Sequence, residues 1–509
     1  MTFDLTIPAQ LSAALLPDLL LMGGAMILMI LAALRPESDR HQRTVGFASL
    51  ALVAATIASV VWMAMRGDRA EMGGQIAVDG FRWMVDIVVL LGAAGTIALS
   101  IEHNVRDGIT AAESHVLVLF AASGMMVLAA GRDLMVIFLG IEIMSIAVYV
   151  LAGLNRRSAR SAEASLKYFL LGAFATGFLL YGIALVYGAT GSTQLNVIGD
   201  AVYRLGLIDD PMLLIGVGLL LVGLGFKVAA APFHMWAPDV YDGAPTPITA
   251  FMAATVKAAA FATFMRIWYE SFYFAWAGWA KPVFWLAILT MVVGNVVALA
   301  QKNIKRMLAY SSIVHSGYLL VAVLAASAMA SMAFTFYVLA YTLATFGAFA
   351  VVATMQPAGQ TDARISDYEG LWHVRPWLAT AMAVYLLALL GFPVFGGVGF
   401  FAKWYLVQAA LSSRAPLAFI TVVLVVTSVI SAGYYLQVVR VMFMKPRPDD
   451  AVEPAPVGVL TRVVLAVTVV LILGLGLFPS RLVEITSTHG FRAYPYSPSL
   501  GVSLPMRER

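Results

Sequence analysis

The chain alternates between long apolar runs and short polar segments that hold most of its charged residues. Each apolar run is about 20 residues long, which is the length that an α-helix needs to cross the hydrocarbon core of a bilayer. Fourteen such runs predict an all-α, polytopic membrane protein with about fourteen transmembrane helices. The predicted spans are 15–34, 45–65, 83–101, 115–130, 133–153, 164–188, 212–236, 247–268, 282–301, 307–329, 331–354, 377–411, 416–443 and 459–478.

Two of these runs contain residues that interrupt a helix. The seventh run, 212–236, holds Pro232 five residues after Lys227, and the twelfth run, 377–411, holds Pro393. Proline removes a backbone donor and clashes with the preceding turn, and glycine weakens a helix interior. The twelfth run is also too long for one straight helix, and its glycines are Gly391, Gly396, Gly397 and Gly399. We therefore predict that helices 7 and 12 are broken.

The composition indicates a surface that faces lipid. Of the 509 residues, 61% belong to the hydrophobic set and only 12% are charged, which is about half the charged share of an ordinary soluble protein. A soluble protein of this length could not cover its surface with so few charges. The net charge of +4 does not indicate nucleic-acid binding, because membrane proteins concentrate basic residues in cytoplasmic loops. The absence of cysteine excludes disulfides, thiolate zinc sites and iron–sulfur clusters on this chain.

The basic residues of the loops predict an orientation. The loops that follow predicted spans 1, 5, 9 and 13 are basic and all lie on one side, which the positive-inside rule makes cytoplasmic. The opposite loops hold fewer basic residues, with Arg66, Arg69 and Arg82 as the main exception. With an even number of spans, both termini are expected on the outer, periplasmic side. The basic loop residues are Arg35, Arg40, Arg43, Arg156, Arg157, Arg160, Lys302, Lys305, Arg306, Lys445 and Arg447.

Four ionisable residues lie inside predicted spans, namely Glu142, Lys227, Lys257 and Lys403. Lys257 follows Pro247 by ten residues, which places it about 15 Å deep, near the bilayer midplane. Each central lysine costs about 2.5–3.5 kcal/mol to insert. The competing interpretation is a buried Glu–Lys pair that only locks helices together. One carboxylate cannot neutralise three lysines, so the set is more typical of an ion path.

The choice of lysine suits proton transfer. Burial and like-charge neighbours favour the neutral amine, whereas an approaching carboxylate favours the charged ammonium. A lysine whose glutamate partner moves nearer or farther can therefore take up and release a proton. Arginine could not do so, because its pKa is too high for it to lose the proton. We predict that protons, or another small cation, move through these four residues.

Two histidines are weaker candidates, each with a structural alternative. His315, in the tenth span, could relay protons between two half-channels or simply hydrogen-bond across helices. His234, near the cytoplasmic end of the seventh span, could act in gating or be a structural histidine at the interface. Ser145 and Tyr149 lie one and two turns beyond Glu142 and could carry water molecules.

Other polar residues are more typical of structure than of function. Asp133 precedes the fifth span and could cap its helix. Glu163 and Lys167 are four residues apart, as in a surface ion pair. Asp86 lies within the third span but near its outer end, and we assign it no role.

Several segments are similar to those of a known family. GFKVAAAPFHMWAPDVYDGAPTPITAFMAATVKAA (225–259) resembles the signature region of the antiporter-like membrane subunits of respiratory complex I. Further segments carry the resemblance from the fourth to the twelfth span: LGIEIMSIAVYVLAG (139–153), EASLKYFLLGAFATG (163–177), QKNIKRMLAYSSIVHSGY (301–318) and GFPVFGGVGFFAKWY (391–405). A lysine at position 403 favours one branch of this family over a sister branch, in which the resemblance places a glutamate.

The resemblance implies an organisation of the chain. It implies two five-helix repeats with opposite orientations in the membrane. The two predicted breaks lie five spans apart, as expected for equivalent positions in two such repeats, and an odd number of helices in each repeat inverts the second one. Residues 1–114 would form an N-terminal three-helix segment. The repeats would occupy 115–270 (helices 4–8) and 281–445 (helices 9–13). Residues 446–509 would hold the last helix and an exposed C-terminal tail, which we expect from position 479 onward.

The resemblance also implies roles for the four buried charges. Glu142 matches the coupling glutamate of the fifth span, and Lys227 matches the lysine of the broken seventh span. Lys257 matches the central connecting lysine, and Lys403 matches the terminal lysine of the twelfth span. The expected function is proton translocation as a subunit of NADH:quinone oxidoreductase in the bacterial cell inner membrane. The alternatives are a subunit of a multisubunit sodium/proton antiporter and a non-transporting structural subunit.

The sequence predicts no cofactor or metal site on this chain. The glycines of GVGLLLVGLG (216–225) lack the spacing of a dinucleotide-binding loop and lie within a lipid-length run. NADH, FMN, iron–sulfur clusters and quinone are therefore expected on partner subunits. The implied partners are other membrane-arm subunits of complex I, including another antiporter-like subunit and small helical subunits, together with the lipid bilayer. Nucleic acid is not expected among them.

Overall fold

The regular structure of the chain is almost entirely helical. A computed structural model describes residues 2–4, 6–67, 69–70, 74–357, 363–394, 397–413, 417–449 and 456–489. Among these residues, twelve helices are long and apolar enough to cross a membrane. Two shorter apolar helices, α9 (Pro211–Lys227) and α17 (Pro376–Leu390), accompany them. The chain is an all-α polytopic membrane protein.

The helices begin and end close to the predicted spans. The first half of the chain contains α2 (Leu16–Ala33), α3 (Asp39–Arg66), α4 (Gly80–Arg106), α5 (Glu113–Ala130), α6 (Leu134–Ala152) and α7 (Ala159–Thr190). One continuous rod follows, made of α11 (Thr246–Phe251), the π-helix η2 (Met252–Val256) and α12 (Lys257–Glu270). The later helices are α13 (Trp276–Leu299), α14 (Ile304–Ala325), α15 (Ala328–Met355), α18 (Gly397–Leu411), α19 (Ala418–Met444) and α20 (Val459–Leu477).

Polar side chains cap many of these helices where the apolar runs begin. Asp133 accepts hydrogen bonds from the backbone N–H groups of Met135 and Val136 and thereby starts α6, so its predicted capping role is confirmed. Such caps satisfy donors that the first helical turn leaves without partners. The other capping residues are Ser38, Asp79, Ser158, Asp210, Asn303 and Ser327.

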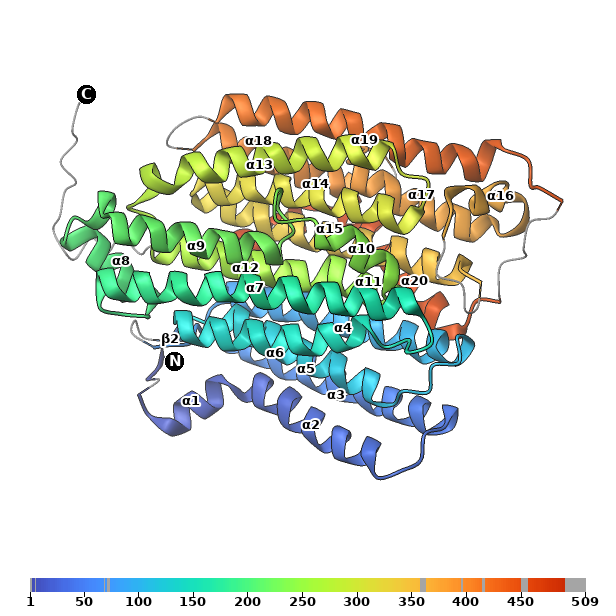
Figure 1. The fold of residues 1–509 in the computed structure, drawn as a ribbon, viewed down its shortest axis with the longest axis horizontal. Coiled ribbons are helices and arrows are strands. Elements are labelled where there is room, and N and C mark those ends of the chain that lie inside the picture. The colour runs from blue at the N-terminus through green and yellow to red at the C-terminus, as the bar shows by residue number, and fades with distance from the viewer. Residues whose placement is uncertain are drawn as a thin grey trace.

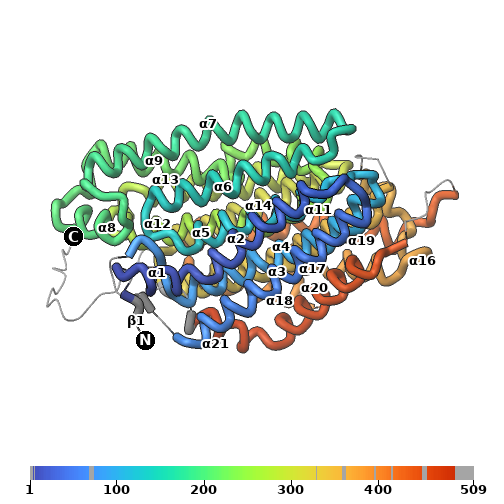
Figure 2. Tube along the Cα trace, turned by 90° about the horizontal axis from the view of Figure 1, so that it is seen from below, coloured from blue at the N-terminus to red at the C-terminus, as the bar shows by residue number. Residues whose placement is uncertain are grey.

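The helices pack side by side with roughly parallel axes (Figure 1). The hairpin of α2 and α3 forms one edge of the bundle, and α19 lies at the opposite edge. Seen from below, α7 and α9 cover one face, and α20 and α21 (Pro479–His489) cover the other (Figure 2). The rod of α11, η2 and α12 is buried along its whole length, and α14 and α15 are almost as buried. The charged centre of this rod is therefore shielded from lipid by surrounding helices.

Glycines bring α6 close to its neighbour α5. A Cβ atom on Gly124 would lie 2.5 Å from the backbone nitrogen of Met144 and 2.9 Å from the carbonyl oxygen of Gly140. The two backbones thus approach more closely than any side chain would allow, as is typical of small residues between membrane helices. This contact fixes α6 on both sides of Glu142, at Gly140 and at Met144.

The chain is interrupted in the seventh predicted span. Helix α9 ends at Lys227, and residues 228–235 form turns before α10 (Trp236–Gly243) begins. Ala229 adopts the left-handed region with φ 55°, which only a few per cent of non-glycine residues do. The apolar run 212–236 is therefore not one helix, and its helical part stops nine residues early. The sequence signal for this stop was Pro232, whose ring cannot follow a regular turn.

The twelfth predicted span is also interrupted. Helix α17 ends at Leu390, and Gly391 closes it with a left-handed φ of 81°. Helix α18 starts at Gly397. Gly396, named in the sequence prediction, lies outside the described residues. The glycine at 391 supplies a conformation that residues with a Cβ rarely adopt.

Several short elements lie outside the predicted spans. Residues 479–509 were predicted as an exposed tail, but α21 forms at their start and packs against α15 and α4; residues 490–509 lie outside the described part. Two-residue strands β1 (Thr2–Phe3) and β2 (Arg69–Ala70) form a parallel pair. The remaining short helices are α1 (Pro8–Ala14), α8 (Leu195–Arg204), η1 (Leu207–Asp209), η3 (Ile365–Tyr368) and α16 (Leu371–Val374).

Candidate functional site

Lys227 ends α9 and directs its amine toward α6. Its Nζ atom donates to Ser145 Oγ at 2.6 Å and to the Tyr149 hydroxyl at 3.3 Å. The Nζ atom also lies 5.4 Å from the centre of the Tyr149 ring. Only 3% of the residue is exposed. The break after Lys227 thus leaves this amine at a helix terminus, held by two hydroxyl groups of another helix.

Glu142 lies on the same face of α6 as those two hydroxyl groups. Positions 142, 145 and 149 are three and four residues apart, so their side chains follow one another along one side of the helix. Glu142 is half-buried, and its Oε1 atom has no hydrogen-bond partner among the described residues. No described ion pair of 4.0 Å or less joins Glu142 to Lys227. The predicted partners share a site, but they are not locked in a direct bond.

Lys257 lies at the centre of the buried rod, immediately after the π-helix η2. Its Nζ atom donates to the backbone oxygen of Ser312 at 2.7 Å and to the Ser312 hydroxyl. The Tyr341 hydroxyl lies 2.8 Å from Ser312 Oγ and 2.9 Å from the carbonyl oxygen of Ala253 in the π-turn. A π-turn breaks the regular pattern of helix hydrogen bonds, and such turns are frequent at functional sites. The central lysine therefore belongs to a hydroxyl network and has no carboxylate partner among the described ion pairs.

His315 continues this network along α14. Its Nδ1 atom lies 2.6 Å from the Tyr337 hydroxyl, and its Nε2 atom lies 3.2 Å from the Tyr435 hydroxyl. The Tyr435 hydroxyl also hydrogen-bonds with Ser311. The imidazole lies 4.9 Å, between ring centres, from Tyr341, which contacts the oxygen that holds Lys257. The histidine thus joins hydroxyl groups of two other helices, α15 and α19.

Lys403 lies beyond His315, on α18. Its Nζ atom donates to the last carbonyl of α17, that of Leu390, at 2.7 Å and to Ser428 Oγ at 2.6 Å. The carbonyl end of a helix carries partial negative charge, which favours an ammonium group there. A small cavity separates the two polar groups, since both His315 and Lys403 line it. Hydroxyl groups and this cavity therefore connect Lys257, His315 and Lys403 in sequence.

His234 lies apart from this series. It is half-buried in the turns that follow the α9 break, and its Nδ1 atom has no hydrogen-bond partner among the described residues. Met235 beside it is 71% exposed. The structure places His234 near the surface and does not bring it to any of the four predicted charges.

The predicted Glu163–Lys167 pair belongs to a larger cluster. Lys167 Nζ lies 2.7 Å from Glu163 and 2.8 Å from Asp239 on α10, and Arg306 on α14 also lies 2.8 Å from Asp239. Burial alone raises the pKa of the Asp239 carboxyl, but hydrogen bonds from Lys167 and Arg306 hold it below its usual value. The cluster therefore ties the segment after the first break to α7 and α14.

A second cluster of buried charges lies at the opposite end of the bundle. Arg82 contacts Asp18 and lies 3.4 Å from Asp86, and all three residues are buried. Arg266 on α12 binds both oxygens of Asp79, at 2.9 and 3.0 Å. These pairs connect α2, α4 and α12, so the N-terminal helices are bonded to the rod that carries Lys257.

Sequence reasoning named Ser145 and Tyr149 only as possible carriers of water, and it missed the hydroxyl groups around Lys257 and Lys403. Ser312, Tyr341 and Ser428 are ordinary residues of apolar spans, and nothing in their local pattern shows which lysine they face. Tyr337 and Tyr341 carried one usable signal, because residues four apart share a helix face. Arg82 and Asp86 carried the same signal, which the sequence interpretation did not use.

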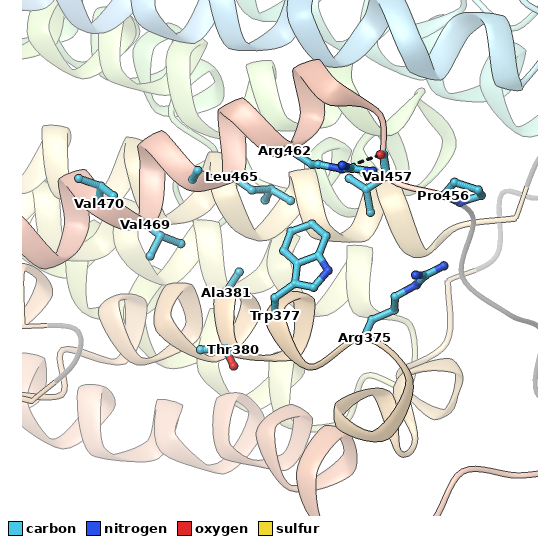
Figure 3. A pocket seen from close by; sticks show the side chains of 11 residues that line it. Arg375, Trp377, Thr380, Ala381, Pro456, Val457, Arg462, Leu465, Val469 and Val470 are labelled. Atoms are coloured by element: carbon cyan, nitrogen blue, oxygen red, sulfur yellow. Dashed lines mark hydrogen bonds between the residues drawn. The ribbon is translucent and has the colours of Figure 1, made fainter.

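A wide groove on the surface is separate from these residues. It lies between α17 and α20 and is lined by Arg375, Trp377, Arg462 and aliphatic side chains. Figure 3 shows both arginines toward the Pro456 end and Val469 toward the other end. None of the four predicted charges lines this groove. The candidate site is therefore the buried series of charges and not this surface groove.

The fold and the buried series of a glutamate and lysines define the class of antiporter-like membrane subunits. The family described as NADH:quinone oxidoreductase/Mrp antiporter, transmembrane, matches residues 131–431. NADH-quinone oxidoreductase subunit N of Gemmatimonas aurantiaca is 50% identical over 497 residues, which cover 95% of each chain. This chain therefore belongs to the subunit N family of NADH-quinone oxidoreductase, the antiporter-like membrane subunits of respiratory complex I.

Solved structures agree with this family. A chain of respiratory complex I from Thermus thermophilus with bound aureothin superposes with a TM-score of 0.76 at 36% identity, covering 93% of this chain and 100% of that one. A chain of the Mrp complex from a Dietzia species has a TM-score of 0.82 at 21% identity, covering 96% of this chain and 99% of that one. The second likeness concerns the fold alone.

Proposed function

We propose that this subunit translocates protons through the buried series Glu142, Lys227, Lys257 and Lys403, with His315 as a relay. The observation that carries this proposal is the set of acceptors around the lysines. Each lysine amine donates to two neutral oxygen atoms and to no carboxylate among the described residues. An ammonium has three N–H donors, whereas a neutral amine has two. The same two bonds therefore serve both protonation states.

The separation of Glu142 from Lys227 supports a coupling step. Glu142 faces Lys227 along α6 without a direct bond, so a small change in their spacing alters how strongly the carboxylate favours the charged amine. Redox energy released in partner subunits would drive that change. The altered field then shifts protons from Lys227 toward Lys257 and onward to Lys403. A proton is taken up from the cytoplasm and released on the outer side.

The break at each end of the series supports this path. Irregular backbone at membrane depth persists only where protein buries it or where it borders water. The interruptions after Lys227 and after Leu390 lie five predicted spans apart, in keeping with two inverted repeats over 115–270 and 281–445. We propose fourteen membrane crossings, with both termini periplasmic, in the bacterial inner membrane. His234, which lies near the first break, would act at the cytoplasmic side of the path.

The proposed partners follow from the family. Other membrane-arm subunits, including another antiporter-like subunit and small helical subunits, would flank this chain. NADH, FMN, iron–sulfur clusters and quinone would be bound by partner chains. Among the described residues, no group of three or more histidine, cysteine, aspartate or glutamate side chains is arranged to hold a metal ion.

The first test measures protons pumped per NADH by the whole complex in membrane vesicles. We expect Lys227→Met and Glu142→Gln each to lower this ratio at least about twofold, because loss of a proton-transfer group slows transfer by orders of magnitude. Glu163→Gln, which removes a surface carboxylate, is the control and should leave the ratio unchanged. An unchanged ratio in both site variants would remove the proposal.

The two alternatives make different predictions for the same vesicles. A sodium/proton antiporter subunit would move protons when an imposed sodium gradient replaces NADH, and we expect no such transport. A structural subunit would need the buried charges only as helix contacts. That alternative is disfavoured because Lys227, Lys257 and Lys403 form no ion pair among the described residues, and an unpaired buried ammonium destabilises a helix bundle.

A further inference from the structure

A polar pocket lies at the loop ends of α4, α11, α14 and α15. Three titratable side chains line it, His103, Asp107 and Lys305, together with the polar side chains of Asn155, Thr246 and Gln356. Its loops include residues beside Arg156 and Arg157, which the positive-inside rule places on the cytoplasmic side. None of the four predicted charges lines this pocket.

Asp107 is the acidic group of the pocket. It follows the last residue of α4, and its Oδ1 atom accepts a hydrogen bond of 3.0 Å from Arg106 Nε. Burial raises the pKa of the Asp107 carboxyl above its usual value, although the charge of Arg106 opposes this. The raised value brings the carboxyl closer to the pH range in which it can exchange protons.

His103 is oriented toward this carboxylate. The Arg106 Nη2 atom lies 2.9 Å from His103 Nδ1. Arginine only donates hydrogen bonds, so Nδ1 must accept, and the ring proton of the neutral imidazole lies on Nε2. That atom is 3.4 Å from Asp107 Oδ2. The histidine therefore positions Asp107 and directs a donor at it.

Lys305 is the third titratable group and is only 1% exposed. Its Nζ atom donates to the carbonyl oxygens of Asp242 and Ala244, both at 2.8 Å. These two bonds leave one further position on the nitrogen, which holds a proton in the ammonium and a lone pair in the amine. Arg160, Asp242 and Asp107 all act electrostatically on this amine. Lys305 repeats the arrangement of Lys227, Lys257 and Lys403.

Two helices, α14 and α11, connect the pocket to the surroundings of the central lysine, Lys257. Lys305 and Ser312 lie seven residues apart on α14, about 10.5 Å along the axis and on the same face. Ser312 is the residue that holds Lys257. Thr246 begins α11, the first part of the rod that carries Lys257.

We propose that this pocket is the cytoplasmic proton port of the central site, with Asp107 as its proton acceptor, His103 as a positioning residue and Lys305 as the next carrier. A proton from solvent binds a carboxylate oxygen of Asp107. It passes to the lone pair of Lys305, which leaves Asp107 ionised, and Lys305 then releases a proton toward Ser312 and Lys257. The proposal rests on the proposed function and names where protons enter this subunit.

Access to the pocket can be tested because the chain contains no cysteine. We expect Asn155→Cys in the intact complex, at a pocket residue that is partly exposed, to react with a small, charged, membrane-impermeant methanethiosulfonate in vesicles whose cytoplasmic face points outward. Thr249→Cys, on α11 three residues beyond the pocket residue Thr246 and 0% exposed, is the buried control and should react at least about tenfold more slowly. The mass of this chain reports the modification. Equal rates, or reaction only from the outer face, would overturn the port.

The acceptor is tested by substituting Asp107. We expect Asp107→Asn to lower protons pumped per NADH at least about twofold and Asp107→Glu to restore most of the loss. Glu113→Gln is the control, because this cytoplasmic carboxylate lies 3.8 Å from Arg156 on the surface. A normal ratio in Asp107→Asn together with a lowered ratio in Lys257→Met would refute the port and leave the proposed function intact. Normal ratios in both would refute the two proposals together.

Discussion

The chemistry of the site depends on what each lysine amine contacts. Lys227 meets two hydroxyl groups, Lys257 meets the carbonyl and hydroxyl of Ser312, and Lys403 meets a carbonyl and a hydroxyl. A carboxylate in any of these positions would hold the proton on the amine, because an adjacent opposite charge stabilises the ammonium. Neutral acceptors satisfy the N–H groups without fixing the charge. The residues are therefore suited to proton exchange more than to permanent ion pairing.

Removal of one neutral acceptor tests this view at a single residue. We expect Ser312→Ala to lower protons pumped per NADH about twofold, since it removes one of the two acceptors of Lys257 and the contact to Tyr341. A lost hydrogen bond to a charged group is worth about 1.5–3 kcal/mol. Thr335→Ala is the control, because among the described residues the Thr335 hydroxyl bonds only to the Ser331 carbonyl of its own helix. Equal ratios in the two variants would contradict the role of Ser312.

At the scale of elements, each helix break lies close to one of the buried lysines. The lysine precedes the first break but follows the second. Lys227 is the last residue of α9 and lies before the first break. Lys403 lies after the second break and reaches back to the terminal carbonyl of α17. Both amines therefore lie near the carbonyl end of a helix, where a positive charge gains about 0.3–1 kcal/mol at exposed sites and up to about 2 kcal/mol when partly buried. This gain offsets part of the penalty for a charge inside the membrane.

At the second break, Gly399 of α18 lies so close to the backbone of α17 that no side chain fits between them. A Cβ atom on Gly399 would lie 1.8 Å from the Ala388 carbonyl oxygen, so Gly399→Ala must push α17 and α18 apart and move Lys403 away from Leu390. We expect a loss of stability of about 1–3 kcal/mol and a lowered proton ratio. Gly474→Ala is the control, because nothing lies within 4 Å of its Cβ position. Thermal unfolding of the purified complex measures both variants. Identical midpoints would show that the contact at Gly399 does not matter.

Across the whole molecule, the sequence predicted what depends on local pattern. The apolar runs located nearly every long helix, and Pro232 and Gly391 marked the two interruptions. Glu142, Lys227, Lys257 and Lys403 stood out because charges inside membrane spans are costly. Their partners could not be predicted, because Ser145 meets Lys227 only after α6 and α9 have packed.

Elements that depend on tertiary contacts were also missed. Helix α8 buries Leu195, Ile198 and Val202 on one face, a short amphipathic pattern that a search for lipid-length runs passes over. The contact between Arg266 and Asp79 joins residues 187 positions apart in the chain, and no local signal pairs them. The N-terminal helices are consequently more firmly bonded to the Lys257 rod than their place before the predicted repeats suggested.

The central claim is that the buried lysines change protonation during turnover. The most direct test is the number of protons pumped per NADH by intact complexes that carry Lys257→Arg, compared with Lys257→Met and with the unaltered protein. Arginine keeps the positive charge but does not release its proton in a protein. We therefore expect Lys257→Arg to lower the ratio as far as Lys257→Met does. A ratio equal to that of the unaltered protein in Lys257→Arg would show that a permanent charge suffices, and it would contradict proton transfer through this residue.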